Sequence, residues 1–238
     1  MKIALIGYGK MGMAIEEIAV SRGHEIVLKV SIENVEDNTL DNLRRADVAI
    51  EFTGPESAYE NLLKCFEAGI PVVCGSTGWL NRLEEAKQKC IANKGALLYA
   101  SNFSVGVNIF FALNEKLASL MADHPEYMPR ITELHHTQKK DSPSGTAITL
   151  AEQILAQNPS KKKWVNRNSE NNTDLPIISE RKDPAPGTHS ILYHSPVDDI
   201  EIIHTAHNRQ GFALGAVLAA EFLFDKNGIF SMKDVLGI

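Results

Sequence analysis

The chain has 238 residues, 44% of them hydrophobic, and a formal net charge of −6, which suits one large globular domain or two small ones. Its acidic balance argues against a nucleic-acid partner, which needs a basic surface. The longest nearly uncharged stretch, residues 212–224, would span only about 20 Å as a helix, too short to cross a bilayer. Because the N-terminus also lacks a signal-peptide core, we expect a cytoplasmic protein with no membrane partner.

A glycine pattern follows the first apolar run. The string LIGYGKMG places Gly7, Gly9 and Gly12 in a GxGxxG motif. It lies among a predicted strand, helix and second strand at residues 3–6, 11–21 and 26–32, which is the setting that a dinucleotide fingerprint requires. Gly7 would permit the tight turn, Gly9 the approach of the pyrophosphate, and Gly12 close packing of the helix. Glu33 then ends the second strand, where an acid can bind the adenosine ribose.

Strands and helices continue to alternate after this unit. The predicted strands are 48–52, 71–74 and 96–100, and the predicted helices are 55–68 and 80–93. This alternation indicates a parallel sheet covered on both faces. Two loops follow strand ends, GSTG at 75–78 and ASNF at 100–103. Each is equally consistent with a loop that contacts the nicotinamide half of a dinucleotide and with an ordinary turn. Cys65, Cys74 and Cys90 match no metal motif and are expected to be buried thiols.

The regular alternation of strands and helices ends in the second half of the chain. Helices are predicted at 107–121 and 146–157, strands at 130–135, 190–194 and 200–206, and a return helix at 212–224. The lysine run 161–163 is expected to be a solvated loop. We therefore predict an α/β fold: a Rossmann-type dinucleotide-binding domain, residues 1–105 plus 208–238, with a second α+β substrate-binding and oligomerisation domain, residues 106–207, inserted before the C-terminal return segment.

Residues 133–147, ELHHTQKKDSPSGTA, combine proton-exchanging and anion-binding groups. The imidazoles of His135 and His136 exchange protons near neutrality, and Lys139 and Lys140 supply positive charge. The helix that opens at Ser144, Gly145 and Thr146 offers free N–H groups to a carboxylate or phosphate. Adjacent histidines on a strand point to opposite faces, and no spacing completes a zinc site, so we expect no metal.

A hydride added to a substrate leaves negative charge that a proton or cation must meet. Lys139 is the natural proton donor in this stretch. The helix N-terminus can hold one carboxylate, and His136 can hold another. The residue chemistry thus suggests reduction of a small dicarboxylate that contains a conjugated C=N or C=C bond.

Four strings, GKMG, GSTG, ASNFSVGVN and ELHHTQKKDSPSGTA, occur in the order found in dihydrodipicolinate reductases, and the chain resembles that family along nearly its full length. The resemblance implies NADH- or NADPH-dependent reduction of hydroxy-tetrahydrodipicolinate, a cyclic imine dicarboxylate, to tetrahydrodipicolinate, on the path to diaminopimelate and lysine. It also implies a homotetramer built through the second domains.

The resemblance implies roles for individual residues as well. His135 would donate or accept a proton, Lys139 would donate one, and His136, Gly145 and Thr146, with Ser144, would bind the substrate. The implied cofactor-binding residues are Gly7, Tyr8, Gly9, Lys10, Met11, Gly12, Glu33, Gly75, Ser76, Thr77, Ala100, Ser101, Asn102, Phe103 and Arg209.

Two departures from the family bear on the cofactor. Lys10 stands where the family commonly has Arg, and Asn34 stands where many NADPH users place Arg after the acid. Since an acid at Glu33 tolerates a free hydroxyl better than a phosphate, we expect NADH to be preferred or at least fully used. Lys10 still offers charge to a 2′-phosphate. A third departure, RKDPAPG at 181–187, stiffens a stretch that is more often rich in glycine.

Two other functions remain open at this stage. One is a nicotinamide-dependent amino-acid dehydrogenase acting on aspartate or diaminopimelate, because such folds host many substrates. The other is a non-catalytic NAD(H) sensor, although the acidic chain shows no DNA-binding or partner segment.

Overall fold

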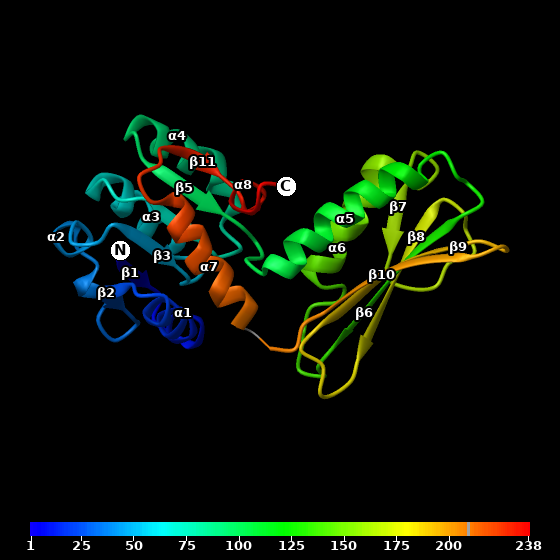
Figure 1. Cartoon of the computed structure of the whole chain (residues 1–238), viewed down its shortest axis with the longest axis horizontal. Coiled ribbons are helices and arrows are strands. Elements are labelled where there is room, and N and C mark those ends of the chain that lie inside the picture. Colours follow the sequence, from blue (N-terminus) through cyan, green and yellow to red (C-terminus); the bar gives the residue numbers. More distant parts are fainter. Residues whose placement is uncertain (209) are drawn as a thin grey trace. The chain divides into compact units, whose positions relative to one another are not determined.

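The computed structural model describes residues 1–208 and 210–238. The chain forms two compact units, Met1–Val105 with Gln210–Ile238, and Gly106–Arg209 (Figure 1). Each unit has its own hydrophobic core, two clusters on either side of a sheet in the first and one cluster in the second. We call them the nucleotide unit and the substrate unit.

The nucleotide unit is built on a parallel sheet of six strands within residues 1–105 and 210–238, in the order β11-β5-β4-β3-β1-β2. The strands are β1 (Lys2–Ile6), β2 (Glu25–Val30), β3 (Val48–Glu51), β4 (Val72–Cys74), β5 (Ala96–Tyr99) and β11 (Gly228–Phe230). Their central members are continuous apolar runs because both faces of the sheet are covered. Strand order reverses between β1 and β3, which is where open sheets of this kind bind ligands.

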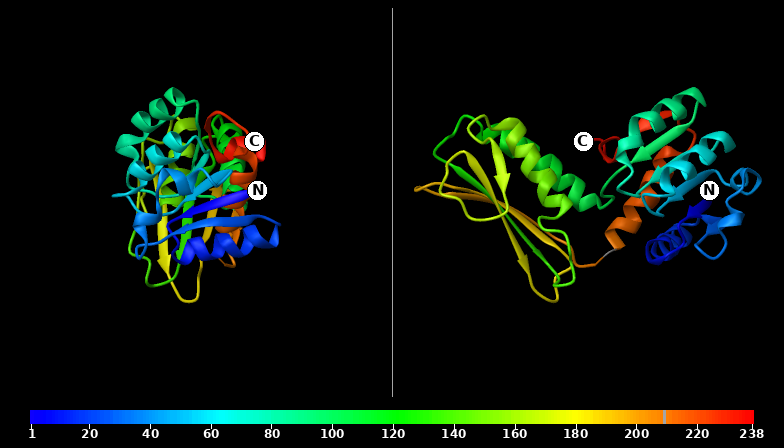
Figure 2. Two further views of the ribbon diagram at one scale, coloured as in Figure 1. Left: turned by 90° about the vertical axis from the view of Figure 1, so that its left-hand side faces the viewer. Right: turned by 180° about the vertical axis from the view of Figure 1, so that it is seen from behind.

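Helices cover both faces of this sheet (Figures 1 and 2). Ile15 and Ala19 of α1 (Lys10–Ser21) share one core cluster with Val217 of α7 (Gln210–Leu223). The other face packs against α3 (Ala58–Ala68) and α4 (Leu83–Ala92) through residues such as Leu62 and Ala86. The remaining helical segments are η1 (Val35–Asp37), α2 (Leu40–Leu43), η2 (Leu80–Arg82) and α8 (Met232–Leu236). The predicted Rossmann-type α/β fold is confirmed.

One predicted helix start is wrong. The sequence predicts a helix from Pro55, but α3 begins at Ala58. The carbonyl of Gly54 accepts hydrogen bonds from the N–H groups of both Ser57 (3.2 Å) and Ala58 (3.0 Å). The residues around Pro55 therefore close a turn before the helix begins, and Pro55 lies in that turn.

The substrate unit contains a mixed sheet of five strands within residues 106–208, in the order β10-β9-β6-β8-β7. The strands are β6 (Met128–His135), β7 (Lys163–Val165), β8 (Asp174–Arg181), β9 (Thr188–His194) and β10 (Asp199–Thr205). One face packs against α5 (Val105–Met121) and α6 (Gly145–Gln157), with Ile131, Ile177 and Ile191 in the shared core. The second sheet domain that the sequence predicts is confirmed.

The lysine run does not form the expected solvated loop. Lys161 is only 6% exposed, and its Nζ donates to the carbonyl of Asn172 at 2.7 Å. Lys163 begins β7, which the sequence did not predict. A lysine stem packs readily on apolar surface while its head finds a polar partner, so charge alone did not reveal the burial.

All three cysteines are free and buried, as expected, and burial raises the pKa of the Cys90 thiol to about 11. Within the described parts of the chain, no helix has both the length and the apolar composition needed to span a membrane.

Helix α7 packs against the loop after β5 through Gly215. A Cβ on Gly215 would lie 1.7 Å from the carbonyl oxygen of Phe103, whereas a Cβ on Gly211 would meet only the Ser104 hydroxyl at 3.6 Å. We predict that Gly215→Ala lowers the free energy of unfolding by about 1–3 kcal/mol because of overpacking. The control Gly211→Ala should raise it by up to about 1 kcal/mol through helix propensity. Urea denaturation measures both, and equal stability of Gly215→Ala and wild type would contradict the close approach.

Candidate active site

The glycine loop joins β1 to α1 by close backbone contact. Gly7 has φ +99°, and a Cβ there would lie 2.2 Å from the carbonyl oxygen of Phe52. A Cβ on Gly12 would lie 2.7 Å from the carbonyl oxygen of Gly7. Around Gly9, by contrast, a Cβ would meet no atom of the described chain within 4 Å. The loop is thus closely packed at Gly7 and Gly12 and open at Gly9. The open side lies next to the N-terminus of α1, as a bound pyrophosphate requires.

A cavity of about 440 Å³ opens beside this loop, at the point where the strand order reverses. Its lining includes Tyr8, Gly9, Ile32, Phe52 and Thr53. The Tyr8 hydroxyl donates to Glu16 of α1, and Glu16 pairs with Lys29 of β2 at 2.6 Å. Tyr8 therefore anchors the loop to both neighbouring elements.

Two other members of the loop differ in exposure. The Lys10 side chain is exposed, which leaves it accessible to an anion beside the loop. The Met11 side chain packs partly against the core. The cavity and the open side of Gly9 fit a dinucleotide, whose contribution when bound is a transferable hydride.

The segment after β2 is acidic and is cross-linked by hydrogen bonds of Asn34. Asn34 accepts from the N–H of Ser31 at 2.7 Å and donates to Asp37 at 2.8 Å, so its amide is engaged within the turn. Glu33 is exposed, and Glu36 and Asp37 follow it. Three carboxylates therefore lie in the turn that carries the predicted ribose ligand.

The two predicted nicotinamide loops meet at one aromatic ring. A Cβ on Gly75 would lie 2.2 Å from the Phe52 ring, and the Phe52 and Phe103 ring centroids are 5.5 Å apart. Phe103 is 2% exposed, so its side chain belongs to the core, while Ser101 and Thr77 are exposed. Phe52 also lines the cavity and thus connects the glycine loop to both loops.

The remaining predicted residues of these loops are placed as follows. Ser76 is buried, with no partner for its hydroxyl in the described chain. Ala100 is half-buried, and Asn102 accepts from the N–H of Ser104 at 2.9 Å. Arg209, the last predicted cofactor residue, lies outside the described residues.

In the substrate unit, the loop from β6 leads to the N-terminus of α6. Ser144 is the N-cap, and its hydroxyl accepts from the N–H of Ala147 at 3.2 Å. The first helical bond runs from the N–H of Ile148 to the carbonyl of Ser144. The N–H groups of Gly145 and Thr146 therefore precede the helical ladder, and such groups at a helix N-terminus favour an anion. Ser144 itself is buried and supports the site rather than lining it.

His135, at the end of β6, is 7% exposed. Burial, with further contributions from His189, Lys139 and Arg181, lowers the pKa of His135 to about 4, against an opposing effect of Glu133. Its imidazole is therefore neutral at neutral pH. With this pKa the imidazole is a weak base near neutral pH, so its ring offers a lone pair to a hydrogen-bond donor more readily than it takes up a proton.

Lys139 makes an ion pair that the sequence did not reveal. Its Nζ lies 2.7 Å and 2.8 Å from the two carboxylate oxygens of Asp141, and the ion pair lowers the pKa of Asp141. The N–H of Lys139 donates to the carbonyl of His136 at 3.2 Å, which folds the loop over the strand end. His136 is half-buried and Lys140 is exposed. The loop thus holds one ammonium group with a local counterion.

Glu133, which the sequence places on the same strand face as His135, and two residues from other strands surround the His135 ring. Glu133 is fully buried, and its carboxylate accepts from the N–H of Ser144 (3.1 Å) and from Arg181 (3.2 Å). His189 faces it from β9 as its cross-strand partner. Burial opposes ionisation of Glu133, but hydrogen bonds from His189, Ser144, Ser179 and Arg181 outweigh it and hold its pKa well below the usual range. Side chains alternate between the two faces of a strand, so the sequence places Glu133 on the same face of β6 as His135. His189 and Arg181 lie on β9 and β8, which are distant in sequence.

Glu133, His135 and His189 offer donor atoms that all lie within 4.8 Å of one another, a spacing that could hold a metal ion. However, the carboxylate already binds the Arg181 guanidinium and the Ser144 N–H. The oxygen that faces the two histidines, Oε2, also accepts from the Ser144 N–H at 3.2 Å, and Oε1 is occupied by Arg181. We interpret the cluster as an ion-pair network, and the expected absence of a metal stays a prediction.

A cavity beside a glycine loop, at the point where the strand order of a parallel sheet reverses, is where dinucleotide-dependent oxidoreductases bind their cofactor. Family models described as "Dihydrodipicolinate reductase, N-terminus" and "Dihydrodipicolinate reductase, C-terminus" match residues 1–103 and 106–236. The chain belongs to the dihydrodipicolinate reductase family.

Curated relatives agree. The 4-hydroxy-tetrahydrodipicolinate reductase of Christiangramia forsetii is 52% identical over 99% of this chain and 98% of that protein. The enzyme of the same name from Neisseria meningitidis is 33% identical over 94% of this chain and 84% of its own length.

Solved structures agree at the level of the fold. A dipicolinate-bound dihydrodipicolinate reductase from Paenisporosarcina has a TM-score of 0.78, 24% identity and 98% coverage of both chains. An amine dehydrogenase from Mycobacterium smegmatis has a TM-score of 0.65 and 11% identity, with coverage of 98% of this chain and 95% of that one. The predicted family is confirmed.

We predict that His135 stays neutral as the pH falls from about 8 to about 5. Its folded-state pKa is about 4, below the value of about 6.5 for an unfolded chain. Because the unfolded chain takes up this proton more readily, the group destabilises the folded unit as pH falls between those two values. Nitrogen-15 NMR of histidine-labelled protein, titrated folded and in urea, measures both midpoints. A folded midpoint at or above that of the unfolded chain would refute the assignment.

Proposed function

We propose that the chain reduces 4-hydroxy-tetrahydrodipicolinate to tetrahydrodipicolinate with NADH or NADPH and loss of water, in the diaminopimelate route to lysine. Family membership and the names of its relatives support this proposal. The observation that carries it is the connection from β6 to α6, which contains His135, Lys139 and the free N–H groups at the start of α6.

The substrate carries two carboxylates, and the loop offers a place for each. The N–H groups of Gly145 and Thr146 bind one of them, with the α6 dipole favouring its negative charge. His136 binds the other from the half-buried position after the strand end. Ser144 holds the first turn of α6 in place through its capping bond.

Proton transfer divides between two residues. The nicotinamide supplies the hydride when bound, and the electron pair that it adds to the substrate must be matched by a proton. Lys139 donates that proton once the dianionic substrate competes with Asp141 for its ammonium. His135 is neutral and buried, and acts as the acceptor of a proton or hydrogen bond at the other side of the site.

Both rival functions use the same fold. A diaminopimelate dehydrogenase from C. glutamicum has a TM-score of 0.54 at 12% identity, which is a likeness of fold alone. A dehydrogenase for free amino acids would have no evident need for the spacing HHTQKKDSPSGT at residues 135–146, and would oxidise its amino acid. A sensor would bind NAD(H) without turnover.

We predict that Lys139→Ala lowers kcat by roughly 10²-fold or more, because a general acid is lost, while nicotinamide binding is retained. Lys140→Ala, which removes an exposed charge from the adjacent position, is the matched control and should keep most of the activity. A coupled assay in which a synthase supplies the unstable substrate measures turnover, and NADH fluorescence measures binding. Wild-type protein that binds NADH without consuming it would instead support the sensor.

NADH is proposed as the preferred cofactor. The turn that follows β2 carries Glu33, Glu36 and Asp37, and the Asn34 amide is committed to bonds within that turn. A 2′-phosphate would therefore meet carboxylates where NADPH-specific relatives place a cation. The exposed Lys10 of the glycine loop offers a compensating charge.

We predict that kcat/KM is at least as high with NADH as with NADPH. Glu33→Gln should shift the ratio toward NADPH because it removes like-charge repulsion. Asp41→Asn, an exposed acid outside the turn, should leave the ratio unchanged. Steady-state kinetics with both cofactors give the ratios. A wild-type preference for NADPH of more than about tenfold, or about 1.4 kcal/mol, would overturn this proposal.

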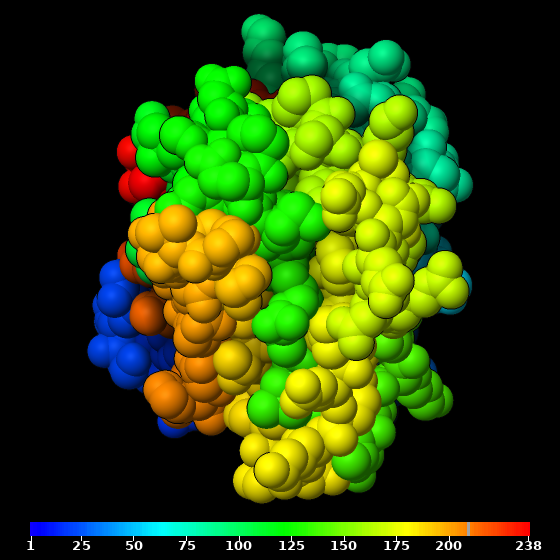
Figure 3. All heavy atoms as spheres, turned by 90° about the vertical axis from the view of Figure 1, so that its right-hand side faces the viewer, coloured from blue at the N-terminus to red at the C-terminus, as the bar shows by residue number. Residues whose placement is uncertain are grey.

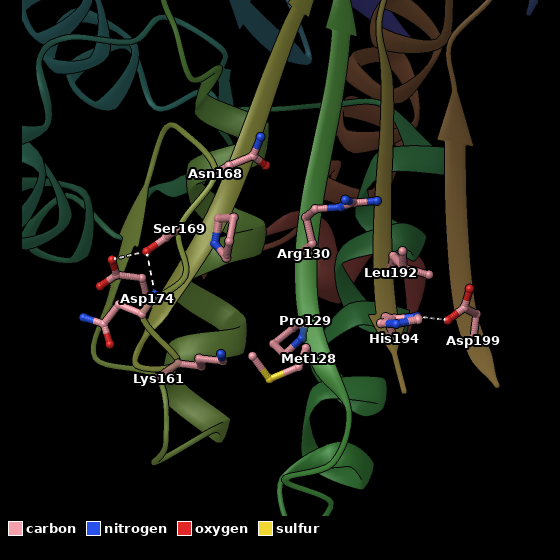
Figure 4. A pocket seen from close by; sticks show the side chains of 12 residues that line it. Met128, Pro129, Arg130, Lys161, Asn168, Ser169, Asp174, Leu192, His194 and Asp199 are labelled. Carbon is pink, nitrogen blue, oxygen red and sulfur yellow. Dashed lines mark hydrogen bonds and ion pairs between the residues drawn. The ribbon is translucent and has the colours of Figure 1, made fainter. Parts of the chain in front are cut away.

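A homotetramer formed through the substrate units is also proposed, as the family resemblance implies. The sheet face that looks away from α5 and α6 carries exposed Met128 and Ile203 and is seen directly in Figure 3, with β6 in green and β10 in orange. It contains a hollow of about 470 Å³ lined by residues such as Arg130, Leu192 and Asp199 (Figure 4). A sheet face that carries exposed apolar side chains among charged ones, and that no helix of the described chain covers, is suited to pairing with another subunit.

We predict a solution mass of four chains by light scattering. Ile203→Glu, on the proposed contact face, should lower that mass. Ile91→Glu, which replaces an exposed isoleucine in α4 of the nucleotide unit, should not. A monomeric wild type would contradict the proposal.

A further inference from the structure

We propose that Glu133 is the positioning residue of the site: its buried carboxylate fixes His135 with the proton on Nδ1 and Nε2 open to the ligand, and at the same time holds the first turn of α6. This inference rests on the proposed function, since it assigns how the base and the anion site are kept in register. Glu133 itself does not touch the substrate.

The carboxylate of Glu133 is the common contact of the cluster. Its Oε1 lies 3.1 Å from the N–H nitrogen of Ser144 and 3.2 Å from Nη2 of Arg181. Its Oε2 lies 3.2 Å from the same Ser144 nitrogen, 3.4 Å from Nδ1 of His135 and 3.7 Å from Nε2 of His189. Every one of these neighbours is a donor, or can become one, around a residue with no exposed surface.

The two ring nitrogens of His135 have different surroundings. Nδ1 is buried and has no hydrogen-bond partner in the described chain, and the carboxylate of Glu133 lies beside it at 3.4 Å. Such catalytic contacts are often long in a ligand-free protein and shorten when the ligand binds. A proton on Nδ1 can therefore be met by Glu133, which leaves the lone pair on Nε2. The His135 side chain keeps 9% exposure while Nδ1 is enclosed, so the exposed part of the ring lies away from Nδ1 and Nε2 is the nitrogen that we assign to the ligand.

Gly187 limits the ring from the other side. A Cβ at this position would lie 3.1 Å from Nε2 and 3.2 Å from Cδ2 of His135, and its φ is +152°. The ring is thus confined between the Glu133 carboxylate and the Gly187 backbone. A T-shaped contact with the His189 ring, at a centroid distance of 5.0 Å, further restricts it.

The same carboxylate reaches the anion site. Ser144, whose N–H contacts both oxygens of Glu133, is the N-cap of α6. Its hydroxyl also lies 3.1 Å from Nε2 of His189. Glu133 therefore connects the end of β6, where His135 lies, to the start of α6, where the N–H groups of Gly145 and Thr146 lie. A shift of Glu133 would move the base and the anion site relative to each other.

A purely structural ion pair is the competing interpretation, because Arg181 alone could account for the burial of Glu133. The two interpretations differ in the tautomer of His135. A structural pair with Arg181 places no demand on Nδ1, whereas a positioning carboxylate requires a proton there. The tautomer is therefore the decisive observable.

Glu133→Gln is the sharpest variant because it keeps the volume and removes one acceptor. The amide oxygen is needed by the two donors at Oε1, Arg181 and the Ser144 N–H. The amide NH₂ then faces Nδ1 of His135, which must become an acceptor, so the proton moves to Nε2. The same change of tautomer disables a histidine base when its aspartate partner is replaced by asparagine in serine proteases.

The control is Asp174→Asn, which is also a buried carboxylate-to-amide change in the substrate unit. Asp174 accepts from Ser169 at 2.8 Å and takes no part in the cluster around His135. Thermal unfolding of both variants identifies any general loss of stability. All samples contain EDTA, so that no metal ion bound to Glu133, His135 and His189 can alter the tautomer of His135.

Nitrogen-15 NMR of histidine-labelled protein, with the His135 signal assigned from His135→Asn, should show the Nδ1–H form in the wild type and in Asp174→Asn. Glu133→Gln should show the Nε2–H form. It should also lose roughly 10²-fold or more in kcat, with KM for NADH unchanged. An Nε2–H tautomer in the wild type, or a Glu133→Gln enzyme with the kcat of Asp174→Asn, would overturn the proposal.

The two proposals fail separately. If the wild type does not reduce the substrate, the proposed function fails, but the tautomer comparison still tests Glu133. If the wild type is active and the tautomer does not change in Glu133→Gln, only the positioning role is lost.

Discussion

A charge without exposed surface has to be compensated inside the protein, and the carboxylate of Glu133 is the charge on which the substrate unit depends. Removing a carboxylate from water costs several kcal/mol. Hydrogen-bond donors from β8, from β6 and from the N-terminus of α6 must therefore surround it in the folded protein. Arg181 brings the countercharge and Ser144 brings an N–H group. The cluster is therefore satisfied only when the strand register and the loop from β6 to α6 are both correct, which are the same conditions that place His135 and the anion site.

The candidate site of the nucleotide unit depends on close approach of backbone atoms instead of on charged side chains. Gly7 and Gly12 allow contacts that any Cβ would prevent, and Gly9 leaves space next to a helix N-terminus. Phe52 then joins the glycine loop to the two following loops by packing. One unit thus offers neutral backbone and shape, while the other offers charge and exchangeable protons. This division matches a reaction in which one ligand brings the hydride and protein groups bring the proton.

Much of this organisation was predictable from local pattern, and the failures have specific causes. The parallel sheet followed from apolar runs alternating with amphipathic helices, and the stretch 133–147 marked the site because its residues are contiguous. Strand β7 was missed because it has only three residues, and β8 because a proline interrupts its apolar run Leu-Pro-Ile-Ile. Lys161 was misjudged because its charge hid a buried stem and a carbonyl partner. Asp141 was visible in the motif, but its pairing with Lys139 depends on loop conformation.

By itself, the sequence determined the fold class, the family and the chemical character of the stretch that receives the proton. These depend on periodicity, glycine spacing and residue type within short segments, and all of them are local. Only the tertiary structure decided that His135 is neutral, that Glu133 is the shared acceptor, and that His189 and Arg181 complete the cluster. Protonation depends on burial and on charges a few ångströms away, and those distances are set by pairing between strands that are remote in the chain.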